Sequence, residues 1–317
     1  MNKIYYCSSI KLIKEYRINK LILRKKNFAS SFSSSEFSKI IGLIVTPLTK
    51  ISVSEILKMK NIKFIFIMGL HKLSNIDLLK LPKKIKILFF DKKKNKSVLN
   101  KISPTPEFII GLICILARNL NFFYQNKKNL NLYNKFNNSY FFEKMISNAT
   151  LGIIGYGRIG KKLAQYAIQF GMKVIVYAPN QKINNSKISK VFNLSSVATK
   201  SDFISINASL KKNNYNLIDK KFFEKMKKNS YFINTAKGDL INLEHLTNVI
   251  IKNKISGAAI DVYSKENENL IINNHKIALA QKEKKNLIFT PHIAGATKYD
   301  RLQLQNRMFY LIKKHLS

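Results

Sequence analysis

The fold prediction for this chain rests on fourteen residues, Thr150-Leu-Gly-Ile-Ile-Gly-Tyr-Gly-Arg-Ile-Gly-Lys-Lys-Leu163. An apolar run ends in a glycine turn, a helical pattern follows, and a second apolar run, Lys173-Val-Ile-Val-Tyr177, comes next. This order is typical of a dinucleotide-binding βαβ unit. Gly155 permits a tight turn, Gly157 lets backbone N–H groups approach a pyrophosphate, and Gly160 lets the helix pack closely. Glycine turns also serve packing alone, but this setting favours a dinucleotide site.

Further apolar runs follow this unit and alternate with helical patterns. Such runs are typical of strands buried on both faces, as in a parallel sheet. The sequence therefore predicts an α/β fold with a doubly wound parallel sheet. The later predicted strands are Phe203–Asn207, Ser230–Asn234, Ile255–Ile260 and Asn286–Thr290.

The first ninety residues carry a second set of strand and helix patterns. This regular alternation indicates that the basic, serine-containing N-terminus belongs to the fold rather than to a transit peptide. The charged run Asp91–Lys96 is a candidate domain boundary. The predicted elements are strands at Lys3–Ser8, near Leu43, near Phe64 and at Ile85–Phe90, and a short helix at Ser9–Ile18.

An apolar helix is predicted from Thr105-Pro-Glu107 to Arg118, because proline and an acidic residue both favour the first turn. The longest unbroken apolar stretch, Phe108–Ala117, is too short to span a bilayer, so we expect no membrane association. Cys7 and Cys114 lie far apart and form neither a disulfide framework nor a metal-ligand pattern. We therefore expect no metal site and a cytoplasmic location.

The formal net charge of +39 raises the question of a nucleic-acid partner. However, 50 of the 56 basic residues are lysines, spread along the whole chain. Arginine is the better group for forked contacts with phosphates and bases. The composition therefore favours a generally basic protein without a specific nucleic-acid partner, although salt-sensitive attraction to polyanions is expected.

Reactive side chains follow three of the predicted strands. Lys237 follows one strand, Asp261 and Glu266 follow the next, and His292 follows the last. Ligands of doubly wound sheets bind outside the carboxyl ends of the strands. A carboxylate beside an imidazole stabilises its protonated form, and a nearby cation can hold a carboxylate. Such a set can move a proton on a substrate oxygen while a hydride moves.

Each of these residues also has a purely structural interpretation. A histidine such as His292 often only satisfies local hydrogen bonds, Glu266 lies in a charged segment that could be a solvated loop, and Lys237 is one of 50 lysines. Their joint position at three strand ends, after a glycine turn, makes the catalytic interpretation about as strong as the structural one.

These segments together resemble the D-isomer-specific 2-hydroxyacid dehydrogenases, a family that includes phosphoglycerate dehydrogenase and glyoxylate/hydroxypyruvate reductases. The resemblance covers nearly the whole chain and is strongest from Ser103 to Thr297. The segments that carry it are Ser103–Leu112 and Leu116–Asn119, Thr150–Tyr177, Ser201–Ser205, Ile233–Gly238, Gly257–Val262 and Thr290–Thr297.

The resemblance implies roles for individual residues. It implies that His292 and Glu266 are the catalytic acid/base pair and that position 237 grips the substrate carboxylate. The implied cofactor-binding residues are Gly155, Gly157, Arg158, Ile159, Gly160, Ala178, Thr235, Ala236, Asp261 and Gly295, and the implied substrate-binding residues are Leu70, His71 and Lys72.

The resemblance also implies an organisation and partners. Two Rossmann-like domains are expected, with a dinucleotide-binding domain at 98–297 inserted into a substrate domain made of 1–97 and 298–317. The implied activity is hydride transfer between NAD or NADP and a small D-2-hydroxy acid or 2-keto acid. Members of the family are commonly dimers joined through their nucleotide domains, so a homodimer is expected.

The chain departs from the family pattern at several positions. The family's arginine is Lys237 here, which keeps the charge but lacks the planar fork. The acid that binds the ribose hydroxyls is replaced by Ala178, and Lys182 and Lys187 nearby could tolerate the 2′-phosphate of NADP. Lys72 replaces a glycine of the substrate loop. Further glycine and proline positions of the family are lost around Asn148, Ser209 and Asn267.

Three hypotheses follow from this pattern. An active NAD(P)-dependent oxidoreductase leads, because His292 and Glu266 are retained. A catalytically weakened, dinucleotide-binding pseudoenzyme of the same fold is the alternative, favoured by Lys237 and Ala178. A nucleic-acid-binding protein is third and would need a clustered basic face.

Overall fold

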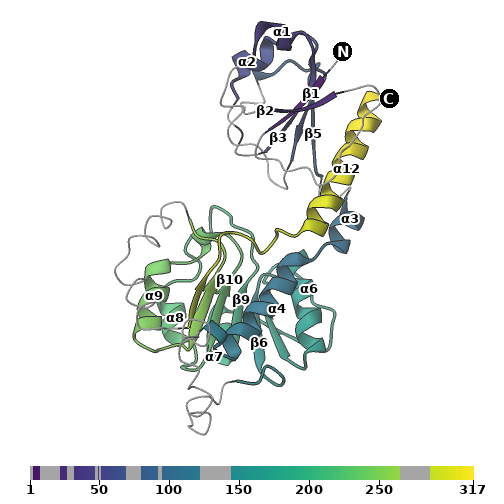
Figure 1. Ribbon diagram of the computed structural model, residues 1–317. Coiled ribbons are helices and arrows are strands. Elements are labelled where there is room, and N and C mark those ends of the chain that lie inside the picture. Colours follow the sequence, from purple (N-terminus) through teal and green to yellow (C-terminus); the bar gives the residue numbers. More distant parts are fainter. Residues whose placement is uncertain are drawn as a thin grey trace, which may run out of the picture. The chain divides into compact units, whose positions relative to one another are not determined.

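The structure is a computed structural model that describes residues 3–7, 22–26, 32–46, 49, 51–68, 80–91, 95–121, 144–264 and 286–317. The chain divides into two compact units, drawn in Figure 1. Unit 1 comprises Met1–Ile102 and Thr297–Ser317, and unit 2 comprises Ser103–Ala296. Unit 2 is therefore inserted into the sequence of unit 1. The sequence predicts these two boundaries between residues 97 and 98 and between residues 297 and 298.

Unit 1 is built on a five-stranded parallel sheet in the order β2-β1-β3-β4-β5, the second common order of doubly wound sheets. The middle strands β3 and β4 are buried along their whole length, as their continuous apolar sequences predict. The strands are β1 Lys3–Cys7, β2 Ile22–Lys26, β3 Ile40–Val45, β4 Phe64–Ile67 and β5 Lys86–Phe89.

The helices α1, α2 and α12 of unit 1 begin at sequence-encoded caps. Ser33 and Glu36 form a capping box at the start of α1, and the Thr297 hydroxyl accepts a hydrogen bond from the Asp300 N–H at the start of α12. Met308 and Ile312 of α12 are fully buried in the same core as β3 and β4, so the last helix belongs to unit 1. The helices are α1 Ser34–Phe37, α2 Val53–Leu57, α3 Lys96–Lys101 and α12 Lys298–Leu316.

Unit 2 is built on a seven-stranded parallel sheet in the order β12-β11-β10-β9-β6-β7-β8. The chain order reverses between β6 and β9, which is the switch point where dinucleotides bind in such folds. The strands are β6 Thr150–Ile154, β7 Lys173–Tyr177, β8 Ile188–Val191, β9 Phe203–Ile206, β10 Tyr231–Asn234, β11 Gly257–Ile260 and β12 Leu287–Phe289.

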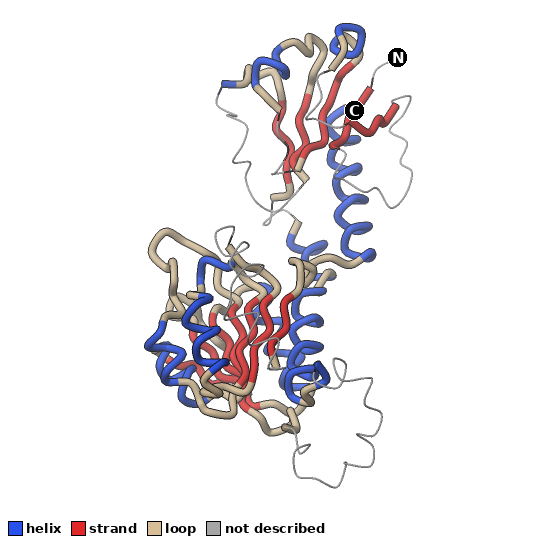
Figure 2. Tube along the Cα trace, turned by 60° about the vertical axis from the view of Figure 1, so that its left-hand side comes forward, coloured by secondary structure: helices blue, strands red, loops and turns tan. Residues whose placement is uncertain are grey.

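Helices cover both faces of this sheet, as Figures 1 and 2 show. One core joins α4 and α6 to the first face, and a second core joins α7, α8 and α9 to the other. The predicted doubly wound α/β fold is thus confirmed. The helices are α4 Pro104–Ala117, α6 Arg158–Gln169, α7 Leu194–Lys200, α8 Lys220–Lys225 and α9 Leu243–Ile251, with a 3-10 turn at Gly238–Leu240.

Two strands were missed by the sequence patterns, and both lie at sheet edges. β2 contains the charged run Arg24-Lys25-Lys26, and β8 is largely half-buried or exposed. An edge strand packs on fewer neighbours and needs fewer apolar residues, so its sequence can resemble a loop, whereas the edge strands β5 and β12 keep apolar runs that the sequence predicts. The predicted helix Ser9–Ile18 lies outside the described residues.

The predicted apolar helix is present as α4. By length and composition, the helical stretch Lys96–Ala117 could cross a membrane, with a mean hydropathy of 1.3 over its most apolar 18 residues. The side chains of Ile109, Ile113 and Leu116 are fully buried in the core of unit 2, which accounts for the apolar character of α4. Core helices commonly pass this length and hydropathy test.

An ion-pair cluster ties the amino ends of β6 and β9 together. The Asp202 carboxylate accepts hydrogen bonds from the Lys144 ammonium at 2.7 Å and from the Thr150 N–H at 2.8 Å, and Lys227 lies at 3.3 Å. Burial acts to raise the pKa of Asp202, but these hydrogen bonds and charges outweigh it, so the pKa lies below its ordinary value.

Candidate active site

The glycine turn after β6 has the geometry that a dinucleotide site needs. Gly155 adopts a φ of 96°, a region that side chains rarely enter. Its N–H donates to the Tyr177 carbonyl at 2.9 Å, and a Cβ atom placed on it would lie 2.6 Å from the Ala208 nitrogen. Only glycine fits here, because the turn lies against the backbone that follows β9.

The other two glycines of the turn differ in what surrounds them. A Cβ atom on Gly160 would lie 2.2 Å from the Gly155 carbonyl oxygen, so this residue lets α6 pack against the turn. A Cβ atom on Gly157 would meet nothing within 4 Å. Gly157 is the N-cap of α6, and no side chain caps the helix there. The turn therefore leaves open the space in which a pyrophosphate would approach backbone N–H groups, so the residues fit a bound dinucleotide.

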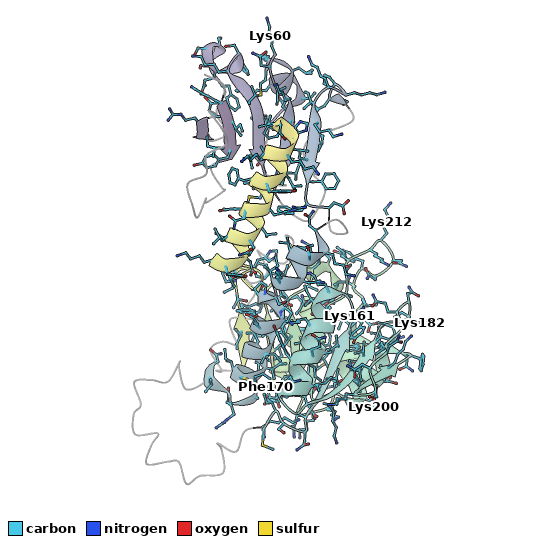
Figure 3. All side chains as sticks on the ribbon, turned by 90° about the vertical axis from the view of Figure 1, so that its right-hand side faces the viewer. Lys60, Lys161, Phe170, Lys182, Lys200 and Lys212 are labelled. Atoms are coloured by element: carbon cyan, nitrogen blue, oxygen red, sulfur yellow. The ribbon has the colours of Figure 1, made fainter. Side chains whose placement is uncertain are left out.

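The first turn of α6 adds positive charge beside this space. Arg158 begins the helix and is exposed, whereas Ile159 is half-buried and packs on the core. The turn contains no acidic residue, and the Lys161 ammonium lies 5.5 Å from the centre of the Tyr156 ring. Figure 3 labels Lys161 on this helix. Both the helix dipole and these side chains favour an anion.

Ala178 follows β7 directly and is only 5% exposed, so it offers the ribose no polar group. The backbone beyond it is held by a lysine that the sequence did not single out. The Lys190 ammonium on β8 donates to the Gln181 carbonyl at 3.0 Å and to the Pro179 carbonyl at 3.5 Å.

Lys237, the side chain predicted to bind the substrate carboxylate, follows the end of β10. Asn234 is fully buried, and its side chain accepts from the Ala236 N–H and donates to the Val262 carbonyl, both at 3.2 Å. Thr235 and Ala236 are half-buried, and Lys237 is exposed. A Cβ atom on the next residue, Gly238, would lie 2.2 Å from the Ser264 nitrogen. This close approach fixes Lys237 at the carboxyl ends of β10 and β11.

Asp261 follows β11 and braces the turn that follows β12. Its carboxylate accepts from the Thr290 hydroxyl at 2.6 Å, the Ile293 N–H at 2.8 Å and the Ala294 N–H at 3.0 Å. Asp261 is fully buried. A buried carboxylate with three protein donors is well compensated, and it holds the turn in one conformation. The sequence predicted a cofactor role for Asp261 and missed this bracing role and the part of Thr290.

His292 sits at the centre of the braced turn. Its N–H donates to the Asp261 carbonyl at 2.9 Å, its φ is 55°, and its side chain is exposed. The Asp261 N–H in turn donates to the Asn234 carbonyl at 2.9 Å. Backbone hydrogen bonds therefore connect the ends of β10, β11 and β12. Gly295 is exposed, and a Cβ atom on it would lie 3.7 Å from the Thr105 hydroxyl.

Four predicted site residues, Glu266, Leu70, His71 and Lys72, lie outside the described residues. In the described part of the chain, no three His, Cys, Asp or Glu side chains form a metal-binding group. A cavity of about 330 Å³ opens at the amino ends of β10–β12, opposite the site, and contains none of the predicted site residues.

Comparisons with known proteins identify relatives of this chain. A family model described as D-isomer specific 2-hydroxyacid dehydrogenase, NAD binding domain, matches residues 110–294. A protein of Staphylococcus epidermidis, provisionally named 2-hydroxyacid dehydrogenase, is 36% identical over 160 residues, which are 50% of this chain and 48% of that protein. The aligned part thus spans about half the length of the curated relatives.

Solved structures match over almost the whole chain. D-2-hydroxyisocaproate dehydrogenase superposes with a TM-score of 0.79 and 21% identity, covering 99% of this chain and 97% of that one. D-lactate dehydrogenase of Aquifex aeolicus, complexed with NAD and lactic acid, superposes with a TM-score of 0.71 and 23% identity, covering 99% and 95%. At this level of identity the matches establish the fold.

Proposed function

The chain belongs to the D-isomer specific 2-hydroxyacid dehydrogenase family and carries its NAD binding domain, and we propose that it transfers a hydride between NAD or NADP and a small D-2-hydroxy acid or its 2-keto acid. The observation that carries this proposal is the turn that Asp261 braces. It presents an exposed histidine at the carboxyl end of the same sheet that bears the glycine turn.

The glycine turn and the N-terminus of α6 would hold the pyrophosphate. Gly157 leaves room for the backbone contact, and the helix dipole with Arg158 favours the negative charge. When bound, the nicotinamide supplies the hydride for the 2-keto acid or accepts it from the hydroxy acid.

His292 would donate a proton to the carbonyl oxygen of the 2-keto acid as that carbon becomes tetrahedral, and would remove it in the reverse direction. An imidazole can fill both roles, because its protonated form donates a proton and its neutral form accepts one. Glu266, which the family resemblance pairs with it, would stabilise the protonated imidazole. Asp261 would keep the histidine backbone in place.

Lys237 would bind the carboxylate of the substrate. It is exposed at the end of β10, where it can reach a ligand outside the sheet. An ammonium binds a carboxylate as a point charge and does not fix its plane as an arginine fork does. We therefore expect weaker orientation of the substrate than in relatives with arginine.

A screen of cofactor oxidation tests the proposal. NADH and NADPH are each incubated with the full chain and with glyoxylate, hydroxypyruvate, phosphohydroxypyruvate or other 2-keto acids, and absorbance at 340 nm is followed. Turnover of at least one acid, abolished in a His292→Ala variant, supports the proposal. No turnover with any acid, from protein that binds a dinucleotide, favours the alternative of a binding-only pseudoenzyme, for which Lys237 and Ala178 are the motivating residues.

We also propose that the chain acts as a homodimer in the cytoplasm and that its partner is a small acid rather than a nucleic acid. Light scattering of the purified chain measures the mass in solution, and a monomer at all concentrations would contradict the dimer.

A further inference from the structure

The loop after β7 has a fixed cationic group beside it, the Lys190 ammonium. This side chain comes from β8, which pairs with β7 so that Lys190 lies beside Val176. The ammonium donates to the carbonyls of Pro179 and Gln181 and lies 5.5 Å from the centre of the Phe192 ring. These contacts hold it over the backbone that follows β7.

That backbone is where a dinucleotide-binding fold meets the adenosine ribose. In NAD-selective sites a carboxylate there accepts hydrogen bonds from the ribose hydroxyls and repels a 2′-phosphate. Here the position is the buried Ala178, and no acidic residue occurs between Glu143 and Asp202. Nothing in this stretch of sequence therefore opposes a phosphate dianion.

We propose that Lys190 forms a 2′-phosphate subsite, so that the chain binds NADP more tightly than NAD. An ammonium has three donors, and the two carbonyls take two of them. The third remains for a phosphate oxygen, and no salt bridge engages Lys190 among the described residues. This inference rests on the proposed function, because it assumes that a dinucleotide occupies the glycine turn.

Further positive charge lies on the same loop. Lys182 and Lys187 are both exposed between β7 and β8, and Figure 3 labels Lys182. Exposed lysines attract a phosphate but do not fix its position, since their side chains keep many rotamers. Lys190 differs because its head group is already held in place, so less conformational freedom is lost when the phosphate binds.

Calorimetric titration with two cofactor fragments tests the subsite without turnover. Adenosine 2′,5′-bisphosphate carries the extra phosphate, and AMP lacks it. For the native chain we expect the bisphosphate to bind roughly ten- to hundredfold more tightly than AMP, the range for one charge-assisted hydrogen bond. Lys190→Gln should remove most of this difference and leave AMP binding within about twofold of native.

Two further variants complete the test. Lys200→Gln removes the same charge from the end of α7, next to the amino end of the sheet, and should leave both affinities unchanged. Ala178→Asp leaves Lys190 in place but adds a carboxylate, and it should weaken bisphosphate binding and not AMP binding.

The outcomes separate this inference from the proposed function. If Lys190→Gln weakens both fragments equally, the lysine is only a brace for the loop, and the inference is wrong. If AMP binds and the bisphosphate binds no more tightly, the inference again fails while the proposed function stands. If neither fragment binds, the inference is overturned, and the turnover screen decides the proposed function.

Discussion

At the scale of single residues, His292, the proposed acid/base residue, lies in a conformation that the fold holds in place. Its positive φ is uncommon for a residue with a side chain and costs on the order of 1 kcal/mol. The three hydrogen bonds to the Asp261 carboxylate on either side of it maintain that conformation. Strain that persists because its surroundings over-determine it is typical of functional sites.

The first prediction follows from the position of His292. Its side chain is exposed and makes no packing contact that the core needs, so His292→Ala should unfold at a similar denaturant concentration. Turnover of a 2-keto acid should fall at least ~100-fold, since a positioned general acid contributes about that much or more. Steady-state assays and cofactor titration measure both effects. Substantial turnover in the variant would contradict the assigned role.

Lys237 carries the second prediction. Losing one charge-assisted hydrogen bond costs about 1.5–3 kcal/mol, so a lysine site should have roughly ten- to hundredfold lower kcat/KM than an arginine site. Lys237→Arg should therefore raise kcat/KM, and Lys237→Ala should lower it below both. Cofactor affinity is the control and should stay constant. If all three proteins turn over equally, position 237 does not bind the substrate.

At the scale of elements, two glycines of the turn before α6 have different roles, and this gives the third prediction. Gly160 is needed for packing, whereas Gly157 leaves space for a ligand. Gly160→Ala should destabilise unit 2 by ~1–3 kcal/mol or more, because its Cβ atom would overlap the Gly155 carbonyl oxygen. Gly157→Ala should change stability by less than ~0.5 kcal/mol, because nothing lies within 4 Å of its Cβ position.

Dinucleotide binding should change strongly in Gly157→Ala, the variant whose stability changes little. Gly157→Ala should abolish measurable binding, because the new methyl group would occupy the space through which the pyrophosphate reaches the backbone. Urea unfolding and calorimetric titration of the two variants provide the comparison. Unimpaired binding by Gly157→Ala would show that the ligand does not approach this turn.

The ion-pair cluster between β6 and β9 carries the fourth prediction, which concerns pH. The pKa of Asp202 is depressed in the folded chain, so its contribution to stability is present above the unfolded pKa and is lost as pH falls through the folded value. Asp202→Asn should therefore be destabilised relative to native at pH 7, by ~1–3 kcal/mol for the broken network. The difference should shrink as pH falls below about 4.

Urea unfolding of the native chain and Asp202→Asn at pH 7, 4 and about 3 measures this dependence. Glu224→Gln is a suitable control, because among the described residues Glu224 makes only an exposed contact of 3.9 Å with Lys220. Exposed pairs of this kind contribute little to stability. A difference between native and Asp202→Asn that grows toward low pH would contradict the sign of the pKa shift.

At the scale of the whole molecule, the net charge of +39 carries the fifth prediction. The charge should hold the chain on a heparin column at low salt and release it steeply as salt rises, since each neutralised phosphate or sulfate releases counterions. At any one salt concentration, DNA duplexes of unrelated sequence should bind the chain with the same affinity as one another. A duplex preferred by more than about a hundredfold would instead indicate specific recognition.

The sequence by itself determined the α/β class, the dinucleotide turn and most of the strands of unit 2. Parallel strands are buried on both faces, so their apolar runs are visible without knowledge of their neighbours. The three glycines of the turn were also readable from the sequence, because their spacing is that of a known motif, although the backbone contact of Gly155 with Ala208 is long-range. Each meets a steric requirement within a few residues of itself or a generic need of the motif.

Only the tertiary structure revealed the edge strands β2 and β8, the bracing role of Asp261 and the position of the Lys190 ammonium. An edge strand is defined by the strand beside it, and Asp261 lies about thirty residues from the N–H groups that it binds. Lys190 is one of 50 lysines, and nothing in its local sequence distinguishes it from the others. Its contacts exist because β7 and β8 pair, and strand pairing brings together groups that no local pattern connects.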